Sequence, residues 1–96
     1  MADTVGAIQF ENFTGLTSMP QKAASAWSAV EKIIGASYKP LLYVGKKLVR
    51  GTNHYFIAEQ TLITATPTRR IVKLKVNEFN GVFEVVPNSI DEIIFD

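Results

Sequence analysis

The chain has 96 residues, of which 47% are apolar, so it is long enough for one domain with a buried core. It contains no cysteine, which excludes disulfides, thiolate metal sites and a cysteine nucleophile. Its formal net charge is +1, so the composition requires neither nucleic acid nor an anionic membrane as a partner. We therefore expect a single domain over residues 1–96 that holds no cofactor and no metal.

The charges are unevenly distributed along the chain. Between residues 39 and 75 the only acid is Glu59, whereas residues 78–96 contain five acids and no base. The basic residues of the first region are Lys39, Lys46, Lys47, Arg50, Arg69, Arg70, Lys73 and Lys75. We interpret the two regions as solvated strand faces of opposite charge that attract each other.

The N-terminal segment does not resemble a signal peptide, because it carries acids where a signal peptide carries bases. No apolar run approaches the roughly 20 residues that a membrane span requires. We therefore expect a cytoplasmic protein that does not bind membranes.

One amphipathic helix is predicted after a short first strand over residues 6–13. Ser18 can cap the first free amide groups of the helix, and Gln21 lies three residues later, as in a capping box. Gly35 is expected to close the helix by adopting a left-handed conformation. Apolar residues recur at spacings of four, three and four and predict the buried stripe Ala23, Trp27, Val30 and Ile34, which Ala26 and Ile33 widen.

Strand patterns follow Pro40. The first covers residues 41–49, with a bulge at Gly45, and ends at a bend formed by Arg50 and Gly51. A second strand over residues 53–65 ends at the Thr66-Pro67-Thr68 break, with its even-numbered and odd-numbered side chains on opposite faces.

The third long strand, residues 69–79, alternates: Val72, Leu74 and Val76 point one way, and Lys73, Lys75 and Asn77 point the other. Asn80-Gly81 is a typical two-residue hairpin turn before a strand over residues 82–86. Ile90, Ile93, Ile94 and Phe95 are expected to pack back as an edge strand or cap. This order predicts an α+β fold in which one helix packs against a curved antiparallel sheet of four to five strands.

The residues that could support catalysis do not form a recognisable site. His54 is the only histidine and lies within a predicted strand, where a structural role is expected. There is no Gly-x-Ser-x-Gly motif and no glycine-rich phosphate loop. Asp91 and Glu92 are adjacent, so on a strand they point to opposite faces. We therefore expect that the protein is not an enzyme.

A nucleic-acid interface is suggested only by Lys73 and Lys75 on one strand face, with Arg69 and Arg70 nearby. Base stacking would require aromatic side chains interleaved on that face, and none is evident between these basic residues. We therefore do not expect nucleic acid to be a partner.

The segment Lys47-Leu48-Val49-Arg50-Gly51-Thr52-Asn53-His54-Tyr55 resembles the first binding hairpin of the cystatins, which reads Gln-Val-Val-Ala-Gly and is often followed by Thr-Asn-Tyr-Tyr. Identical residues are Val49, Gly51, Thr52, Asn53 and Tyr55. Gly6, preceded by Val5, resembles the glycine of the family's N-terminal trunk. Glu78-Phe79-Asn80-Gly81 lies where the family places its second hairpin.

The resemblance implies a cystatin-like fold and reversible inhibition of papain-like cysteine proteases. In that family the trunk and the two hairpins form a wedge that fills the protease cleft. The residues that the resemblance assigns to protease binding are Val5, Gly6, Lys47, Leu48, Val49, Arg50, Gly51, Phe79 and Asn80.

The chain departs from the family at three points. Lys47 replaces the family's Gln, Arg50 replaces its Ala, and the second hairpin lacks the Pro-Trp pair. The alternative is therefore a non-inhibitory interaction module that uses the same scaffold for another protein partner. We expect a monomer, with an exchange of strands between two copies through the bend at Arg50 as the alternative.

Overall fold

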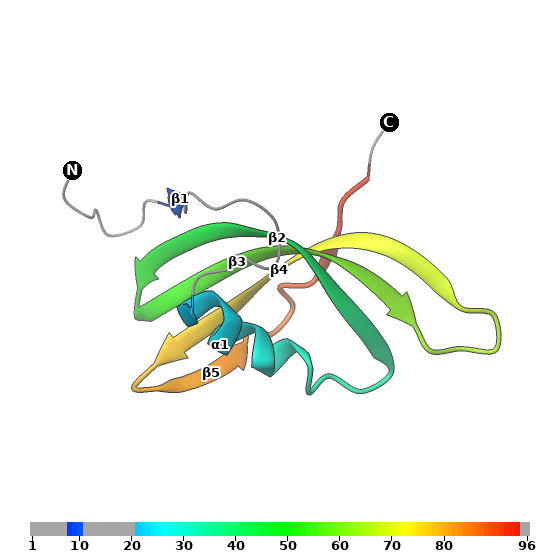
Figure 1. Ribbon diagram of the computed structural model, residues 1–96, viewed down its shortest axis with the longest axis horizontal. Coiled ribbons are helices and arrows are strands. Elements are labelled where there is room, and N and C mark those ends of the chain that lie inside the picture. The colour runs from blue at the N-terminus through cyan, green and yellow to red at the C-terminus, as the bar shows by residue number, and fades with distance from the viewer. Residues whose placement is uncertain (1–7, 11–20, 95–96) are drawn as a thin grey trace.

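The computed structural model describes residues 8–10 and 21–94, which form one helix and six strands (Figure 1). The elements are β1 (Ile8–Phe10), α1 (Gln21–Val30), β2 (Ala36–Val49), β3 (Gly51–Leu62), β4 (Thr68–Phe79), β5 (Val82–Val85) and β6 (Asp91–Glu92). The described fold is therefore α+β, as the sequence predicts. Within the described part of the chain, no helix has the length and apolar character needed to cross a membrane.

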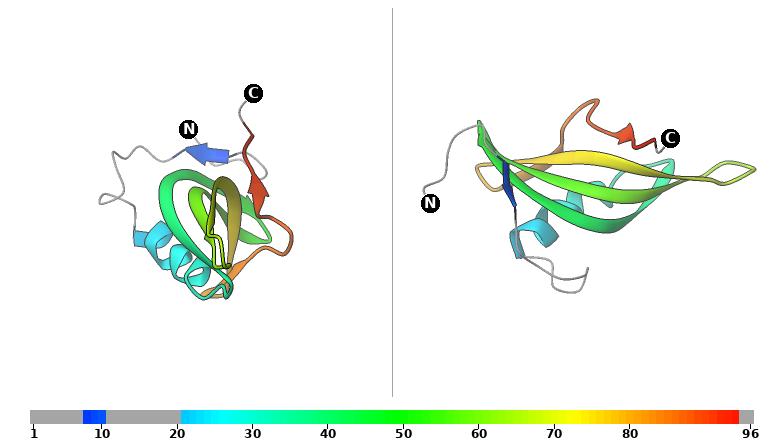
Figure 2. Two further views of the ribbon diagram at one scale, coloured as in Figure 1. Left: turned by 90° about the vertical axis from the view of Figure 1, so that its right-hand side faces the viewer. Right: turned by 90° about the horizontal axis from the view of Figure 1, so that it is seen from above.

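The strands form one antiparallel sheet in the order β1-β2-β3-β4-β5. The short strand β6 pairs with β4 at Val72 and Lys73. It lies on the same edge of β4 as β5, which pairs with residues 76–79. The sheet curls around the single helix, which covers its concave face (Figure 2). This confirms the predicted arrangement of one helix on a curved antiparallel sheet.

The core lies between α1 and the concave face of the sheet. Trp27 meets Phe56 edge-on, with ring centroids 5.2 Å apart, and its predicted burial is confirmed. The buried apolar residues are Ala23, Ala26, Trp27 and Val30 from the helix, and Tyr43, Phe56, Ala58, Val72, Leu74 and Val76 from the strands. Each large side chain buried here stabilises the fold by about 2 kcal/mol.

The helix ends earlier than the sequence predicts. It stops at Val30, and two tighter backbone hydrogen bonds follow, from Lys32 N to Ala29 O and from Ile33 N to Val30 O. The prediction that Ile34 belongs to the buried stripe is wrong, because its side chain is 96% exposed. Gly35 has a left-handed φ of 92°, but it serves the turn into β2 and does not end the helix. The chain leaves the helix early because β2 begins to pair with β3 at Ala36.

Two strand boundaries also differ from the prediction. β2 begins at Ala36 and includes Pro40, whose missing N–H is tolerated because β1 covers only Gly45–Lys47 on that edge. β3 covers Gly51–Leu62, shorter at its end than the predicted 53–65. A register shift between Tyr43 and Gly45, with a φ of 153° at the glycine, confirms the predicted bulge.

The C-terminal segment packs back only in part. Ile90 is half-buried against the core and β6 forms a two-residue edge strand, but Ile94 is exposed, so its predicted packing is wrong. Phe95 lies outside the described residues, as do Val5, Gly6, the proposed cap Ser18 and the parts of the predicted first strand on either side of β1.

Candidate binding surface at the hairpin end

The turn between β2 and β3 is as tight as an antiparallel pair allows. Val49 pairs with Gly51, so Arg50 is the only residue between the two strands. Gly51 has a φ of 80°, which favours glycine. A Cβ atom at this position would collide with the carbonyl oxygen of Glu78 and would lie 3.2 Å from the Cβ of Phe79. Gly51 therefore permits both the bend and the close approach of β4.

The turn between β4 and β5 consists of Asn80 and Gly81, with φ values of 51° and 78°. Two successive left-handed residues between paired Phe79 and Val82 are typical of a type I′ hairpin. The hairpin turn predicted from Asn80-Gly81 is thus confirmed.

The two turns lie side by side at one end of the sheet (Figure 1). The side-chain amide of Asn77 donates to the carbonyl of Arg50 at 3.1 Å and to the side-chain oxygen of Asn53 at 2.9 Å. The guanidinium carbon of Arg50 lies 5.3 Å from the centroid of the Phe79 ring, a cation–π distance. The two hairpins therefore form one continuous surface.

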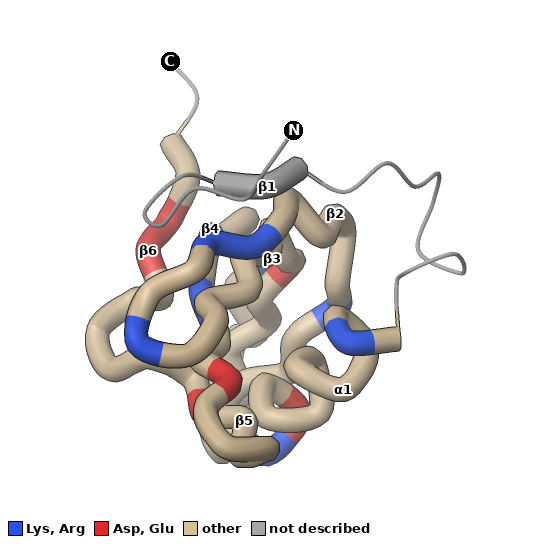
Figure 3. The backbone as a smooth tube through the Cα atoms, turned by 90° about the vertical axis from the view of Figure 1, so that its left-hand side faces the viewer, with Lys and Arg blue, Asp and Glu red and all other residues tan. Residues whose placement is uncertain are grey.

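Apolar side chains are exposed on this surface. Leu48, Val49, Phe79 and Val82 are between 36% and 63% exposed, although all four are large. Together with Arg50 and Asn80 they define what we call the hairpin-end surface, onto which Figure 3 looks. Gathered exposed apolar groups are typical of a protein-binding site.

The predicted site residues are only partly brought together. Leu48, Val49, Arg50, Gly51, Phe79 and Asn80 lie at the two adjacent turns. Lys47 is half-buried on β2, where it pairs with Ile8 of β1 and with Asn53 of β3. Val5 and Gly6 lie outside the described residues, so the structure places β1 near this end but not the trunk itself.

A chain of polar side chains lies beneath the surface. The buried His54 has Nδ1 3.0 Å from the hydroxyl of Tyr43 and Nε2 3.1 Å from the Glu78 carboxylate. Lys22, in the first turn of α1, donates to the other carboxylate oxygen of Glu78 at 3.0 Å. We call Tyr43, His54, Glu78 and Lys22 the buried polar chain, although its outer member Lys22 is 73% exposed, and it links β2, β3, β4 and α1. Sequence reasoning missed it, because no pattern in the sequence indicates these contacts.

Hydrogen bonds from Lys22 and then from His54 lower the pKa of Glu78 below its usual value. Glu78 is therefore ionised at neutral pH and can only accept hydrogen bonds, so Nε2 of His54 must carry its proton. With Nε2 directed at Glu78, Nδ1 is the ring nitrogen that faces the Tyr43 hydroxyl. Both ring nitrogens are satisfied within the protein, which agrees with the structural role expected of His54.

Comparisons of the chain with models of protein families, with curated proteins and with solved structures found no match. In the part of the chain that the structure describes, no three His, Asp or Glu side chains are grouped closely enough to hold a metal ion. The function must therefore be argued from the geometry of the hairpin-end surface and from the motif in the first hairpin.

Proposed function

We propose that this protein is a cystatin-like, reversible inhibitor of papain-like cysteine proteases. The observation that carries the proposal is the union of the two hairpin turns into one stiff surface with exposed apolar side chains. The element order, a short strand, one helix and then antiparallel strands joined by hairpins, is also the order that the cystatin resemblance implies.

The geometry suits insertion into a cleft. The first turn is one residue wide, so its backbone can enter a narrow groove with Leu48 and Val49 on its side. A hairpin that is already held rigid loses little conformational entropy when it docks. The second hairpin adds Phe79 as an aromatic anchor beside it, and such anchors carry much of the binding energy in protein interfaces.

The stacking of Arg50 on Phe79 offers a way to accommodate the charge that replaces the family's small residue. The guanidinium lies over the ring of the neighbouring hairpin, so it need not project straight ahead of the turn. Arg50 can thus stay at the rim of a cleft while Leu48 and Val49 enter it. A buried, unpaired arginine would cost several kcal/mol and would oppose binding.

The stacking of Arg50 on Phe79 also supports the second candidate function, a non-inhibitory interaction module. Arg50 covers part of the apolar anchor Phe79 and presents a cation, which suits a partner with an acidic surface. In that case the hairpin-end surface is still the binding site, but its target is not the cleft of a protease.

Titration of active papain with the purified protein tests the inhibitor proposal. We expect loss of protease activity at micromolar or lower inhibitor concentrations, recovery of activity on dilution, and an intact inhibitor mass after prolonged incubation. Absence of inhibition at micromolar concentrations favours the interaction module. Cleavage of the chain at Arg50 during the assay would contradict the proposed binding mode, because it would make the turn a substrate.

A further inference from the structure

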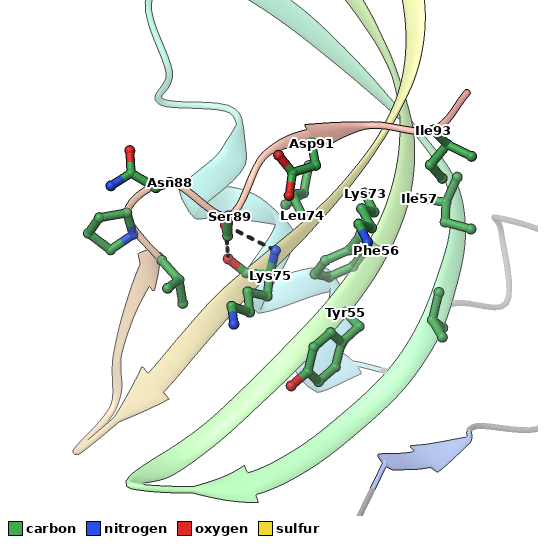
Figure 4. A pocket seen from close by; sticks show the side chains of 13 residues that line it. Tyr55, Phe56, Ile57, Lys73, Leu74, Lys75, Asn88, Ser89, Asp91 and Ile93 are labelled. Atoms are coloured by element: carbon green, nitrogen blue, oxygen red, sulfur yellow. Dashed lines mark hydrogen bonds between the residues drawn. The ribbon is translucent and has the colours of Figure 1, made fainter.

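A cavity of about 540 Å³ lies on the face of the sheet that points away from α1 (Figure 4). Its volume falls within the range of roughly 300–1,000 Å³ that is common for small-ligand sites. It is formed between the outward side chains of β3 and β4 and the segment 86–93, which we call the C-terminal strap. The hairpin-end surface does not contribute to it, since none of that surface's residues lines the cavity.

The cavity walls are held in place by hydrogen bonds between the strap and β4. At one end of the strap Val86 N donates to Lys75 O at 2.9 Å, and at the other Ile93 N donates to Ile71 O at 2.8 Å. Between them the Ser89 hydroxyl lies 3.3 Å from both the backbone nitrogen and the backbone oxygen of Lys75. The strap is therefore fixed at several points and leaves a preformed space.

Most of the wall is apolar. From the sheet it includes Val44, the Tyr55 ring and Ile57, and from the strap Val86, Pro87 and Ile93. When a ligand covers an apolar wall of this kind and displaces its water, binding becomes more favourable by about 25 cal/mol per Å² of apolar area buried.

Three hydrogen-bond donors line the same cavity without a partner. The ammonium groups of Lys73 and Lys75 and the hydroxyl of Tyr55 make no side-chain hydrogen bond or ion pair with any residue that the structure describes. Tyr55 is the cross-strand neighbour of Lys75, and the two side chains lie side by side on the sheet (Figure 4).

The one acid in the lining is Asp91, the cross-strand neighbour of Lys73. Two ammonium groups and one carboxylate leave a local formal charge of +1. This charge is balanced by a ligand with one negative charge better than by a ligand with two negative charges.

We infer that this cavity binds an amphipathic monoanion, a carboxylate attached to an apolar alkyl or aryl body. The carboxylate accepts hydrogen bonds from Lys75, Lys73 and the Tyr55 hydroxyl, and such charge-assisted bonds are stronger than neutral ones. The apolar body lies against Ile57 on the sheet and Pro87 on the strap. The inference is independent of protease inhibition.

Titration with decanoate, kept below its micelle concentration, tests the inference by calorimetry and by amide chemical shifts. We expect saturable binding at one site, with the largest shifts at Tyr55, Lys75 and Ser89. Decanol, which has the same chain without the charge, should bind at least about tenfold more weakly, since one charge-assisted hydrogen bond is worth that factor. Absence of saturable decanoate binding, equal affinity for decanol, or shifts confined to other regions would overturn the inference.

Variants that are expected to change the decanoate affinity in opposite directions distinguish binding at this site from non-specific binding. Lys73→Gln and Lys75→Gln should each weaken decanoate binding by about tenfold, whereas Asp91→Asn should strengthen it by removing the competing negative charge. Lys32→Gln, an exposed lysine just after the helix and outside the cavity lining, should leave the affinity unchanged. Equal affinities in all four variants would show that the cavity lysines do not hold the carboxylate.

Discussion

Gly51 is the residue on which the geometry of the hairpin end depends most directly. Its left-handed φ is one constraint, and the carbonyl oxygen of Glu78 beside its Cα is a second. Gly81 has almost the same φ of 78°, but a Cβ there would meet nothing within 4 Å. A side chain would therefore strain the backbone at both glycines, but it would meet steric crowding only at Gly51.

We predict that Gly51→Ala lowers the free energy of unfolding by clearly more than Gly81→Ala. The left-handed conformation costs an alanine about 1–2 kcal/mol at either site, and overpacking against β4 adds about 1–3 kcal/mol at position 51 alone. Urea unfolding followed by Trp27 fluorescence measures both. Equal losses in the two variants would contradict the close contact between the first turn and Glu78.

Arg50 tests the contact between the two hairpins. Because the cation–π contact is exposed, we predict that Arg50→Ala lowers the free energy of unfolding by no more than about 1 kcal/mol. If the protein is an inhibitor, the variant should bind papain as tightly as the unmodified protein or more tightly. A large loss of papain binding in a folded variant would show that the charge itself is required.

At the scale of elements, the buried polar chain joins the helix to three strands. Glu78 is its central member, because it accepts from both Lys22 and His54. Its lowered pKa means that the unfolded chain binds a proton more readily than the folded protein. The resulting stabilisation is complete above the unfolded value near 4.5 and is lost as the pH falls through the lower folded pKa.

We predict that Glu78→Gln reduces the loss of stability on acidification. The unmodified protein should lose free energy of unfolding as the pH falls below about 4.5, and part of that loss should be absent in the variant. Glu84→Gln, at an exposed position of β5, is the matched control, and its free energy of unfolding should fall with pH as in the unmodified protein. Urea unfolding at a series of pH values on both sides of 4.5 provides the comparison. Parallel curves for all three proteins would contradict the role assigned to Glu78.

The sequence predicted the elements because their signals are local. Alternation identified β3 and β4, Asn80-Gly81 identified the hairpin, and the spacing of Ala23, Trp27 and Val30 identified the buried helix face. The helix end was missed because Ile34 fits the periodic stripe, while the event that ends the helix, pairing at Ala36, is non-local.

The candidate surface was predictable only in part for the same reason. The motif in residues 47–55 located the first turn, but the contacts of Arg50 with Phe79 and of Asn77 with Arg50 join residues far apart in sequence. The buried polar chain and the cavity under the strap likewise depend on which strands become neighbours. Tyr55 is an example, because the pairing of β3 with β4 places its aromatic ring beside Lys75, 20 residues later in the sequence.

At the scale of the whole molecule, the described residues form an elongated body of 48 × 29 × 26 Å. β2 and β3 run along the sheet and join at the hairpin end, and their other ends meet where Ala36 pairs with Leu62. Ile34 is exposed near that far end, just before β2 begins. The described residues thus include exposed apolar side chains at both ends, of which only those of the hairpin-end surface belong to the proposed wedge.

The most direct test compares Val49→Asp with Ile34→Asp in the papain titration. Both changes place a carboxylate on an exposed apolar position, so neither should disturb the core. We predict that Val49→Asp weakens inhibition at least about tenfold, because an unpaired charge must then enter an apolar cleft, and that Ile34→Asp inhibits as the unmodified protein does. Unchanged inhibition by Val49→Asp, or a loss caused by Ile34→Asp, would show that the hairpin-end surface is not what meets the protease.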